Sequence, residues 1–459
     1  MKILRGIAAL LLAALVLHCE AMQQDPDGRG EVLIYPYFTA QDSGGNAFNT
    51  YISVVNDDVP PKALRIRLRE GRNGNEVASF NLLLQGYDTW TGVIVPTPEG
   101  AALQTNDASC ASLNLSNPVP LASPVSATDG LGTDVERMRE GYIEIFEMAS
   151  IHDDPPECST FLAMTLVPAT VQRPSGGLSG TLTLINVQSG MDFTVNAVAL
   201  SDFATAPYFR APSDPYPDYN AAEVAPVAAF YFGDDHLYTS TWESPVQALN
   251  ATLMVQSVMN EVILDRGTLS GTDFVLTMPT RRLAGNAAPF RVFPEGTRDL
   301  TFSIDFNDRE KPRLSIFSDD CPFLCPPGFE QAHMALRSSA NVLSLRTTED
   351  HSSGAPGISD VLGSRNGWLV NMHTDAQNGW VTLGLDSIPL DAPFPHLHHR
   401  IYPNDGTSFE ARPSYSGLPV VGFMVRTFRN GNLQCGSAVC QGNYGGAFPH
   451  KYKRAAYPF

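Results

Sequence analysis

Apolar and charged side chains alternate along residues 64–69, and this two-residue period constrains the fold more than any other feature of the chain. Successive side chains of a β-strand point to opposite faces, so the alternation predicts a strand with one apolar and one charged face. Asn73-Gly74 is typical of a tight turn, and alternation resumes after it, which predicts an antiparallel hairpin over 63–84. The apolar face carries Leu64, Ile66, Leu68, Phe80, Leu82 and Leu84, and the charged face carries Arg65, Arg67 and Arg69.

A second hairpin is predicted over residues 180–200, with its turn at 188–192, because apolar residues again alternate with threonines and other polar residues. One hairpin is barely stable in water, so both need further strands or a second sheet over their apolar faces. Other segments with strand character are 31–38, 50–56, 87–96, 140–148, 228–232, 251–258, 272–279, 300–306, 313–317, 380–385 and 418–428.

The composition favours short strands joined by many turns, since only 17% of residues are charged while the chain has 37 glycines and 35 prolines. We predict an all-β fold with two antiparallel β-sandwich-like domains after a cleaved signal peptide. The predicted boundaries are 1–21 for the signal peptide, 22–203 for the first sandwich, 204–226 for a Pro- and Tyr-rich linker, and 227–459 for the second β-rich domain.

Three local patterns carry weaker predictions. Loosely spaced apolar residues predict a short helix within 331–345, and Asn260-Glu261 is predicted to form a turn. The segment that follows Cys440 is rich in Gly and Tyr and shows no period, so no strand is predicted there.

The first 21 residues resemble a secretory signal, with Lys2 and Arg5 before an apolar run at 7–17 and small residues near a cleavage site. The run is too short to span a bilayer, so the mature chain has no predicted transmembrane segment. Lipid anchoring at Cys19 is the alternative, which His18 disfavours because a small residue is expected there. We expect an exported protein of the periplasm, the cell surface or the medium.

Six cysteines remain beyond Cys19, and an even number in an exported chain predicts disulfides. The close pairs Cys321/Cys325 and Cys435/Cys440 would each close a small loop, which leaves Cys110 and Cys158 by elimination. A four-thiolate metal site is the alternative, which the gaps of three and four residues within the pairs disfavour.

The net charge of −18 argues against nucleic acid or an anionic lipid surface as a partner. The stripe of Arg65, Arg67 and Arg69 has two interpretations: a docking surface for an anionic glycan or lipid headgroup, or a solvated strand face balanced by neighbouring acids. The strong acidity of the chain favours the solvated face.

A metal site is the only chemistry that the sequence suggests, because motifs for nucleophilic, zinc-protease and nucleotide chemistry are absent. A strand would place His396 and His398 on one face, with His373 as a third ligand. Prolines on both sides favour a loop with solvated or packing histidines instead. No cofactor is predicted, and a structural calcium or zinc ion is the alternative.

Several short segments resemble an uncharacterised family of secreted proteins from Gram-negative bacteria with no assigned activity. These segments are 30–39, 87–90, 184–186 with Asn196-Ala197, and 272–282. The first half also resembles bacterial immunoglobulin-like modules. The resemblance implies export and a β fold, and it assigns no functional residue.

The sequence therefore predicts a secreted, non-catalytic cell-envelope or surface protein that acts by binding or as a structural component, with an envelope protein or a glycan as partner. One alternative is a carbohydrate-binding protein that uses exposed aromatic residues, with Trp368 and Trp380 as candidates. The other is a metal-dependent hydrolase that uses His373, His396 and His398.

Overall fold

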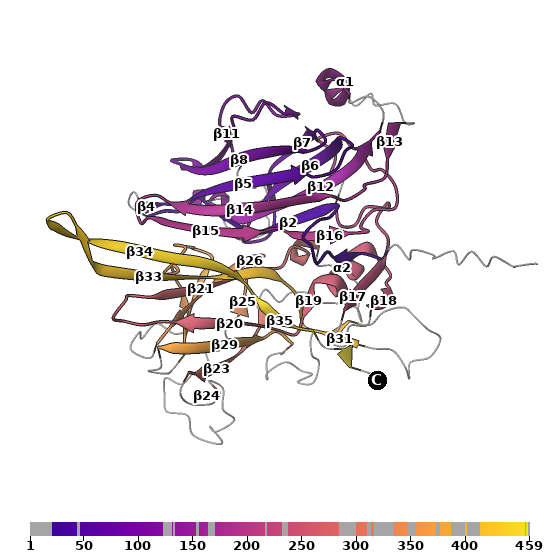
Figure 1. Cartoon of the computed structure of the whole chain (residues 1–459). Coiled ribbons are helices and arrows are strands. Elements are labelled where there is room, and N and C mark those ends of the chain that lie inside the picture. Colours follow the sequence, from indigo (N-terminus) through magenta and orange to yellow (C-terminus); the bar gives the residue numbers. More distant parts are fainter. Residues whose placement is uncertain are drawn as a thin grey trace, which may run out of the picture.

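The computed structural model describes residues 21–457 apart from fifteen gaps. The gaps are 44–45, 123–130, 132–133, 153–155, 164–169, 216–217, 232–236, 284–299, 310–313, 316–334, 348–354, 373–376, 387–399, 402–413 and 455. The described chain is all-β, as predicted, and its few helices are short (Figure 1). Residues 1–20 of the predicted signal peptide and the predicted ligands His373, His396 and His398 lie outside the described residues.

The first unit pairs an eight-stranded sheet with a six-stranded sheet, and all of their strand pairs are antiparallel. Both predicted hairpins are confirmed, as β6–β7 and β14–β15. The larger sheet has the order β1 (Gln23–Gln24), β16 (Val198–Ser201), β2 (Val32–Thr39), β12 (Glu140–Ile151), β6 (Lys62–Glu70), β7 (Glu76–Leu84) and β10 (Cys110–Ala111), with β13 (Val171–Gln172) beside β12. The smaller has the order β11 (Val119–Pro120), β9 (Gly100–Gln104), β8 (Asp88–Thr97), β5 (Asn49–Asn56), β14 (Leu178–Asn186) and β15 (Met191–Asn196).

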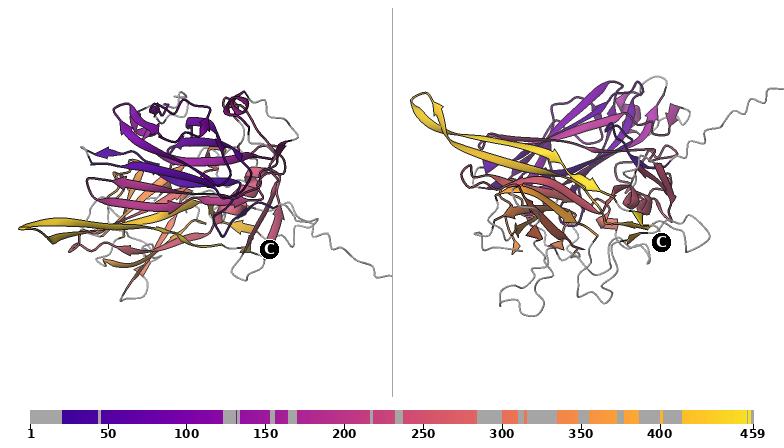
Figure 2. Two further views of the ribbon diagram at one scale, coloured as in Figure 1. Left: turned by 45° about the horizontal axis from the view of Figure 1, so that its top comes forward. Right: turned by 60° about the horizontal axis from the view of Figure 1, so that its bottom comes forward.

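The second unit also pairs two sheets, of five and six strands. The five-stranded sheet has the order β24 (Leu314–Ser315), β23 (Ser303–Asp308), β29 (Asn378–Gly384), β20 (Ser257–Ile263) and β35 (Lys451–Lys453). The six-stranded sheet has the order β27 (Ala355–Pro356), β28 (Gly367–Asn371), β26 (Ala340–Arg346), β21 (Gly271–Thr277), β33 (Val421–Cys435) and β34 (Ala438–Pro449). The long β33–β34 hairpin extends outward past its neighbours (Figure 2).

Smaller elements fill the spaces around these four sheets. The helices are α1 (Cys158–Leu162), α2 (Pro245–Leu253) and the 3-10 turns η2 (Val135–Met138) and η4 (Arg281–Leu283). Short strand groups are β3 (Asp42–Ser43) with β4 (Asn46–Ala47), β17 (Val227–Tyr231) with β18 (Leu237–Thr241), β19 (Met254–Val255) with β32 (Leu418–Pro419), β22 (Leu300–Thr301) with β25 (Ala335–Leu336), and β30 (Arg400–Ile401) with β31 (Ser414–Ser416) and β36 (Ala456–Tyr457).

At β21 and β33, the six-stranded sheet of the second unit packs on both faces. Val275 and Val425 join the core of the first sandwich, while Phe274 and Met424 join the core of the second. Because neighbouring residues of a strand point in opposite directions, this sheet serves both cores at once. The buried carboxylate of Glu140 bonds across the seam, accepting from the Tyr37 hydroxyl at 2.9 Å, the Gln41 amide at 2.6 Å, the Ser364 hydroxyl, and the Arg365 backbone N–H at 2.6 Å.

Three local predictions are wrong. Residues 340–346 form β26 and not a helix, and Asn260-Glu261 lies inside β20 and not in a turn. The segment after Cys440 continues β34 and forms β35. A helix, α2, occupies 245–253, where the Ser244 side chain accepts a hydrogen bond from the Gln247 N–H and caps its first turn.

The described residues of the 204–226 segment do not form a free linker, because they cover the outer face of the eight-stranded sheet. Tyr208 and Tyr219 are fully buried, in one core cluster with Phe146 of β12 and Leu249 of α2. The Phe203 and Ala204 N–H groups donate to the buried carboxylate of Glu31, at 2.9 and 2.8 Å. The tyrosines of this Pro-rich segment are therefore packing residues, and the segment is not a flexible tether.

A buried ion pair holds β6 to β12. The Lys62 Nζ lies 3.1 Å from the Glu147 carboxylate and donates to the Ser175 hydroxyl at 2.7 Å, and both charged side chains are fully buried. The carboxylate also accepts the backbone N–H groups of Ser175 and Gly176, at 2.9 and 3.0 Å. Groups of the protein therefore provide the charge and hydrogen-bond partners of both buried side chains.

We predict that Lys62→Met lowers the free energy of unfolding by about 3–5 kcal/mol, because it leaves the Glu147 charge buried without its cation. The control is Arg29→Met, which removes a pair with Asp57 whose arginine side chain is 51% exposed, and we expect a loss under about 1 kcal/mol. Urea unfolding of both variants measures the difference. Equal losses in the two variants would contradict the stabilising role of the buried pair.

Candidate functional site

A cleft of about 590 Å³ opens at the edge of the second sandwich, between β20, β29 and β35 of one sheet and β33 and β34 of the other. Its volume lies within the range of about 300–1,000 Å³ that is usual for small-molecule sites. The lining residues are Met259, Asn260, Glu261, Trp380, Met424, Arg426, Phe448, Pro449, His450 and Lys451.

Two aromatic side chains on opposite sheets form the rim of the cleft. Trp380 of β29 is 44% exposed and Phe448 of β34 is 37% exposed. The register places Trp380 directly opposite Glu261 on β20, and it places Phe448 opposite Met424 on β33. Residues directly opposite in a sheet share a face, so each ring projects beside a lining neighbour of its own sheet. Large exposed rings at a concave site are typical of ligand contacts.

An ion pair crosses the cleft between these rings. The Arg426 Nη1 of β33 lies 2.5 Å from the Glu261 carboxylate of β20, and it thereby joins the two sheets. The Arg426 guanidinium also lies 4.5 Å from the centre of the Phe448 ring, within the range of a cation–π contact. The Glu261 side chain is 64% exposed and the Arg426 side chain 21% exposed, so both offer polar atoms to a ligand.

His450 lines the cleft with each ring nitrogen beside an oxygen acceptor. Its Nδ1 contacts the side-chain oxygen of Asn260, and its Nε2 lies 3.0 Å from the Val275 carbonyl oxygen. A neutral ring has one N–H and donates to only one of these two oxygens. Burial lowers the pKa of His450 from 6.5 to about 4, so the ring is neutral near pH 7. The buried, neutral ring therefore forms part of the cleft wall.

The arginine stripe of the β6 strand is buried, which corrects the prediction of a solvated face and leaves no exposed docking surface there. Arg65, Arg67 and Arg69 are 0, 3 and 4% exposed. Arg65 donates to the Asn81 side chain at 2.6 Å and to the Ala211 carbonyl at 2.6 Å. The remaining contacts are Arg67 to the Pro215 carbonyl at 2.6 Å, Arg67 to Glu76 at 3.4 Å, and Arg69 to Glu144 at 2.5 Å.

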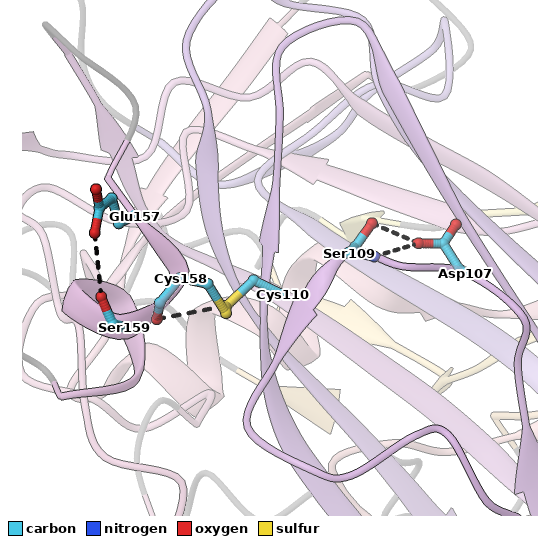
Figure 3. Close-up of a disulfide and its surroundings, with 6 residues drawn as sticks. All are labelled: Asp107, Ser109, Cys110, Glu157, Cys158 and Ser159. Atoms are coloured by element: carbon cyan, nitrogen blue, oxygen red, sulfur yellow. Dashed lines mark hydrogen bonds between the residues drawn. A yellow bond between two sulfur atoms is a disulfide. The ribbon is translucent and has the colours of Figure 1, made fainter.

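The predicted Cys110–Cys158 disulfide is confirmed, with Cα atoms 5.5 Å apart, and it joins β10 to the start of α1 (Figure 3). Cys435 is also in a disulfide. Cys321, Cys325 and the side chain of Cys440 lie outside the described residues. Within the described part of the chain, no group of three His, Cys, Asp or Glu residues is placed to hold a metal ion.

The sequence identified Trp380 as a candidate, but it missed the other cleft residues. Glu261 lies in a predicted turn, and Phe448 and His450 lie in a segment without a predicted strand. The β33–β34 register brings Phe448 beside Met424, and β35 pairs with β20 from 196 positions earlier, as Lys453 opposite Ser257 shows by subtraction. Of the predicted aromatic pair, Trp368 is only 8% exposed and lies outside this cleft.

The fold and the cleft define an all-β protein of stacked, largely antiparallel sheets with a ligand-sized cleft at an open sandwich edge. Comparison of the chain with family models, curated proteins and solved structures finds no match. Among the described residues, no helix has the length and apolar character needed to cross a membrane.

We predict that stability contributed by His450 is lost on acidification. The unfolded pKa is 6.5 and the folded pKa about 4, so unfolding takes up a proton between these values and stability falls as pH drops. The shift corresponds to roughly 3 kcal/mol by pH 4. Urea unfolding at pH 7 and pH 4 measures it, with His450→Gln as control. A pH dependence that is the same in His450→Gln would show that His450 is not responsible.

Proposed function

We propose that this protein is an exported, non-catalytic binding protein of the cell envelope or cell surface, and that its ligand is a glycan held in the cleft. The observation that carries the proposal is the pair of exposed rings, Trp380 and Phe448, on either side of the Arg426–Glu261 ion pair. The N-terminal signal pattern and the Cys110–Cys158 disulfide support export, because disulfides persist in oxidising compartments.

The chemistry of a sugar matches these groups. A pyranose ring has an apolar face of C–H groups, which packs against an exposed indole or phenyl ring, and hydroxyl groups around its edge. The Glu261 carboxylate accepts hydrogen bonds and the Arg426 guanidinium donates them, so the pair can bind neighbouring hydroxyls. A mostly apolar site with a few placed polar groups is the usual construction of a small-molecule site.

The contacts in the cleft favour binding over catalysis. The ring of His450 is buried in the wall and neutral near pH 7. Glu261 is paired with Arg426 at 2.5 Å, and the described residues that line the cleft include no second carboxylate to form an acid–base pair with it. No observation on the described residues favours the alternative of a metal-dependent hydrolase.

The test is a glycan array with the purified mature protein, followed by calorimetry with the oligosaccharide that gives the strongest signal. Trp380→Ala should weaken binding about two- to tenfold, because loss of one stacked ring costs about 0.5–1.5 kcal/mol. Phe448→Ala should act in the same direction.

The matched control is Tyr51→Ala, which removes a ring that is 49% exposed on β5 of the other unit. Its affinity for the oligosaccharide should equal that of the unmodified protein. An array without signal, or equal affinity in Trp380→Ala and the unmodified protein, would refute the proposed glycan site.

A further inference from the structure

The strands on one side of the cleft are basic although the chain as a whole is acidic. The chain has 30 Lys and Arg residues against 48 Asp and Glu, yet residues 421–453, which include β33, β34 and β35, contain two arginines, two lysines and no acid. The lining of the cleft has Arg426 and Lys451 against the single carboxylate of Glu261. Charges more than about 8 Å away are largely screened at physiological salt, so these local groups determine the field that a ligand meets.

The carboxylate of Glu261 does not neutralise the lysines, because it is paired with Arg426 at 2.5 Å. The two lysines of β35, Lys451 and Lys453, are both exposed. Neither of them forms an ion pair with an acid of the described chain. The Arg426–Glu261 pair is close to neutral as a unit, so two ammonium groups remain available to an anionic ligand.

The strand register places the lysines on the same face of the sheet as Trp380. Lys451 lies opposite Met259 on β20, and Lys453 is two residues further along β35. Trp380 lies opposite Glu261, which is two residues beyond Met259 on β20. Residues that are directly opposite, or two apart on one strand, share a face of the sheet. The two ammonium groups and the exposed indole ring therefore project from one surface.

The separation of these groups indicates a ligand longer than one sugar. Lys451 and Trp380 are two strands and two residues apart. Spacings of about 4.8 Å between strands and about 3.4 Å along a strand put their Cα atoms about 12 Å apart. Lys453 lies two residues farther from Trp380 along the sheet. A single pyranose on the indole ring does not reach both lysines, whereas an oligosaccharide does.

The position of the lysines on an edge strand has a second physical explanation. β35 is the last strand of its sheet, and lysines on an edge discourage pairing with a strand of another molecule. Edge protection requires neither a cleft nor a nearby aromatic ring. Lys451 lines the cleft and shares a face with the 44% exposed ring of Trp380, and contact with a ligand accounts for both observations.

We propose that the ligand of the cleft is an acidic oligosaccharide. One sugar ring packs against Trp380, and carboxylate or sulfate groups on neighbouring sugars bind the ammonium groups of Lys451 and Lys453. This inference rests on the proposed glycan function and adds to it the charge and the minimum length of the ligand. Ion pairs at exposed lysines are screened by salt, so affinity for the ligand falls as ionic strength rises.

The test is calorimetry of the full mature chain with matched pairs of glycans. Trigalacturonate, trimannuronate and a hyaluronan tetrasaccharide supply carboxylates, and their carboxyl-reduced forms are the neutral partners. A κ-carrageenan tetrasaccharide supplies sulfate, and its desulfated form is the neutral partner. We expect at least one anionic glycan to bind about tenfold more tightly than its neutral partner, and high salt to remove most of this preference. The pair that responds identifies carboxylate or sulfate as the anion.

The Lys451→Gln variant tests the contact itself. It should weaken binding of the anionic glycan about two- to tenfold, through loss of one exposed charge contact, and narrow the difference from the neutral partner. The matched control is Arg29→Gln, which also removes one positive charge but lies in the first unit, with a side chain that is 51% exposed. Its affinity for the anionic glycan should be unchanged. Circular dichroism checks that both variants are folded.

Equal affinity for the anionic and neutral members of every pair would overturn this inference, as would unchanged binding by the folded Lys451→Gln variant. Binding of neutral glycans that depends on Trp380, without any preference for the anionic forms, would remove the acidic ligand and leave the glycan proposal standing. Absence of binding by every glycan, here and on the array, would overturn both. The two proposals can therefore fail separately.

Discussion

This structure depends on burial of the arginine-bearing face of the eight-stranded sheet. Alternation along β6 directs Leu64, Ile66 and Leu68 into the first sandwich and therefore sends three arginines to the other face. A buried guanidinium is costly unless its N–H groups are paired, and here carbonyl groups of residues 210–215 and nearby carboxylates supply the partners. The segment that covers this face must therefore offer carbonyl groups to the arginines, and residues 210–215 do so. The chain from 203 onward is held in place before it enters the second sandwich.

The second unit is attached to the first by a sheet that likewise packs on both faces at β21 and β33. Its six-stranded sheet contributes one face to each core, and Glu140 bonds groups from both sides of the seam. Two ligand-sized cavities remain between the packed elements. The aromatic cleft lies at an open edge of the second sandwich, and an arginine-lined cavity lies at the seam between the units. The two cavities differ in chemistry, because exposed rings line the first and guanidinium groups line the second.

Local pattern was enough to predict the β class, both hairpins and the Cys110–Cys158 pairing. It was not enough to predict which polar face is solvated, since Arg65 and Arg67 alternate identically whether water or a carbonyl receives their N–H groups. Residues 251–258 carry an apolar run that fits a strand, yet α2, which begins after the Ser244 cap, runs through Leu253. The candidate site was largely hidden because Glu261 meets Trp380 through pairing of distant strands and meets Arg426 across two packed sheets. No local period records either relation.

Amide hydrogen exchange at Phe203, Ala204 and Tyr208 tests the central claim most directly. Their N–H groups donate to the Glu31 carboxylate and to the Met148 carbonyl, at 2.9, 2.8 and 3.0 Å respectively. If this segment is bonded down over the buried arginines, these amides exchange slowly, with protection close to that of β6 and β12. Exchange at the rate of an unstructured peptide, while β6 and β12 remain protected, would show that the segment is a free tether and would contradict the account.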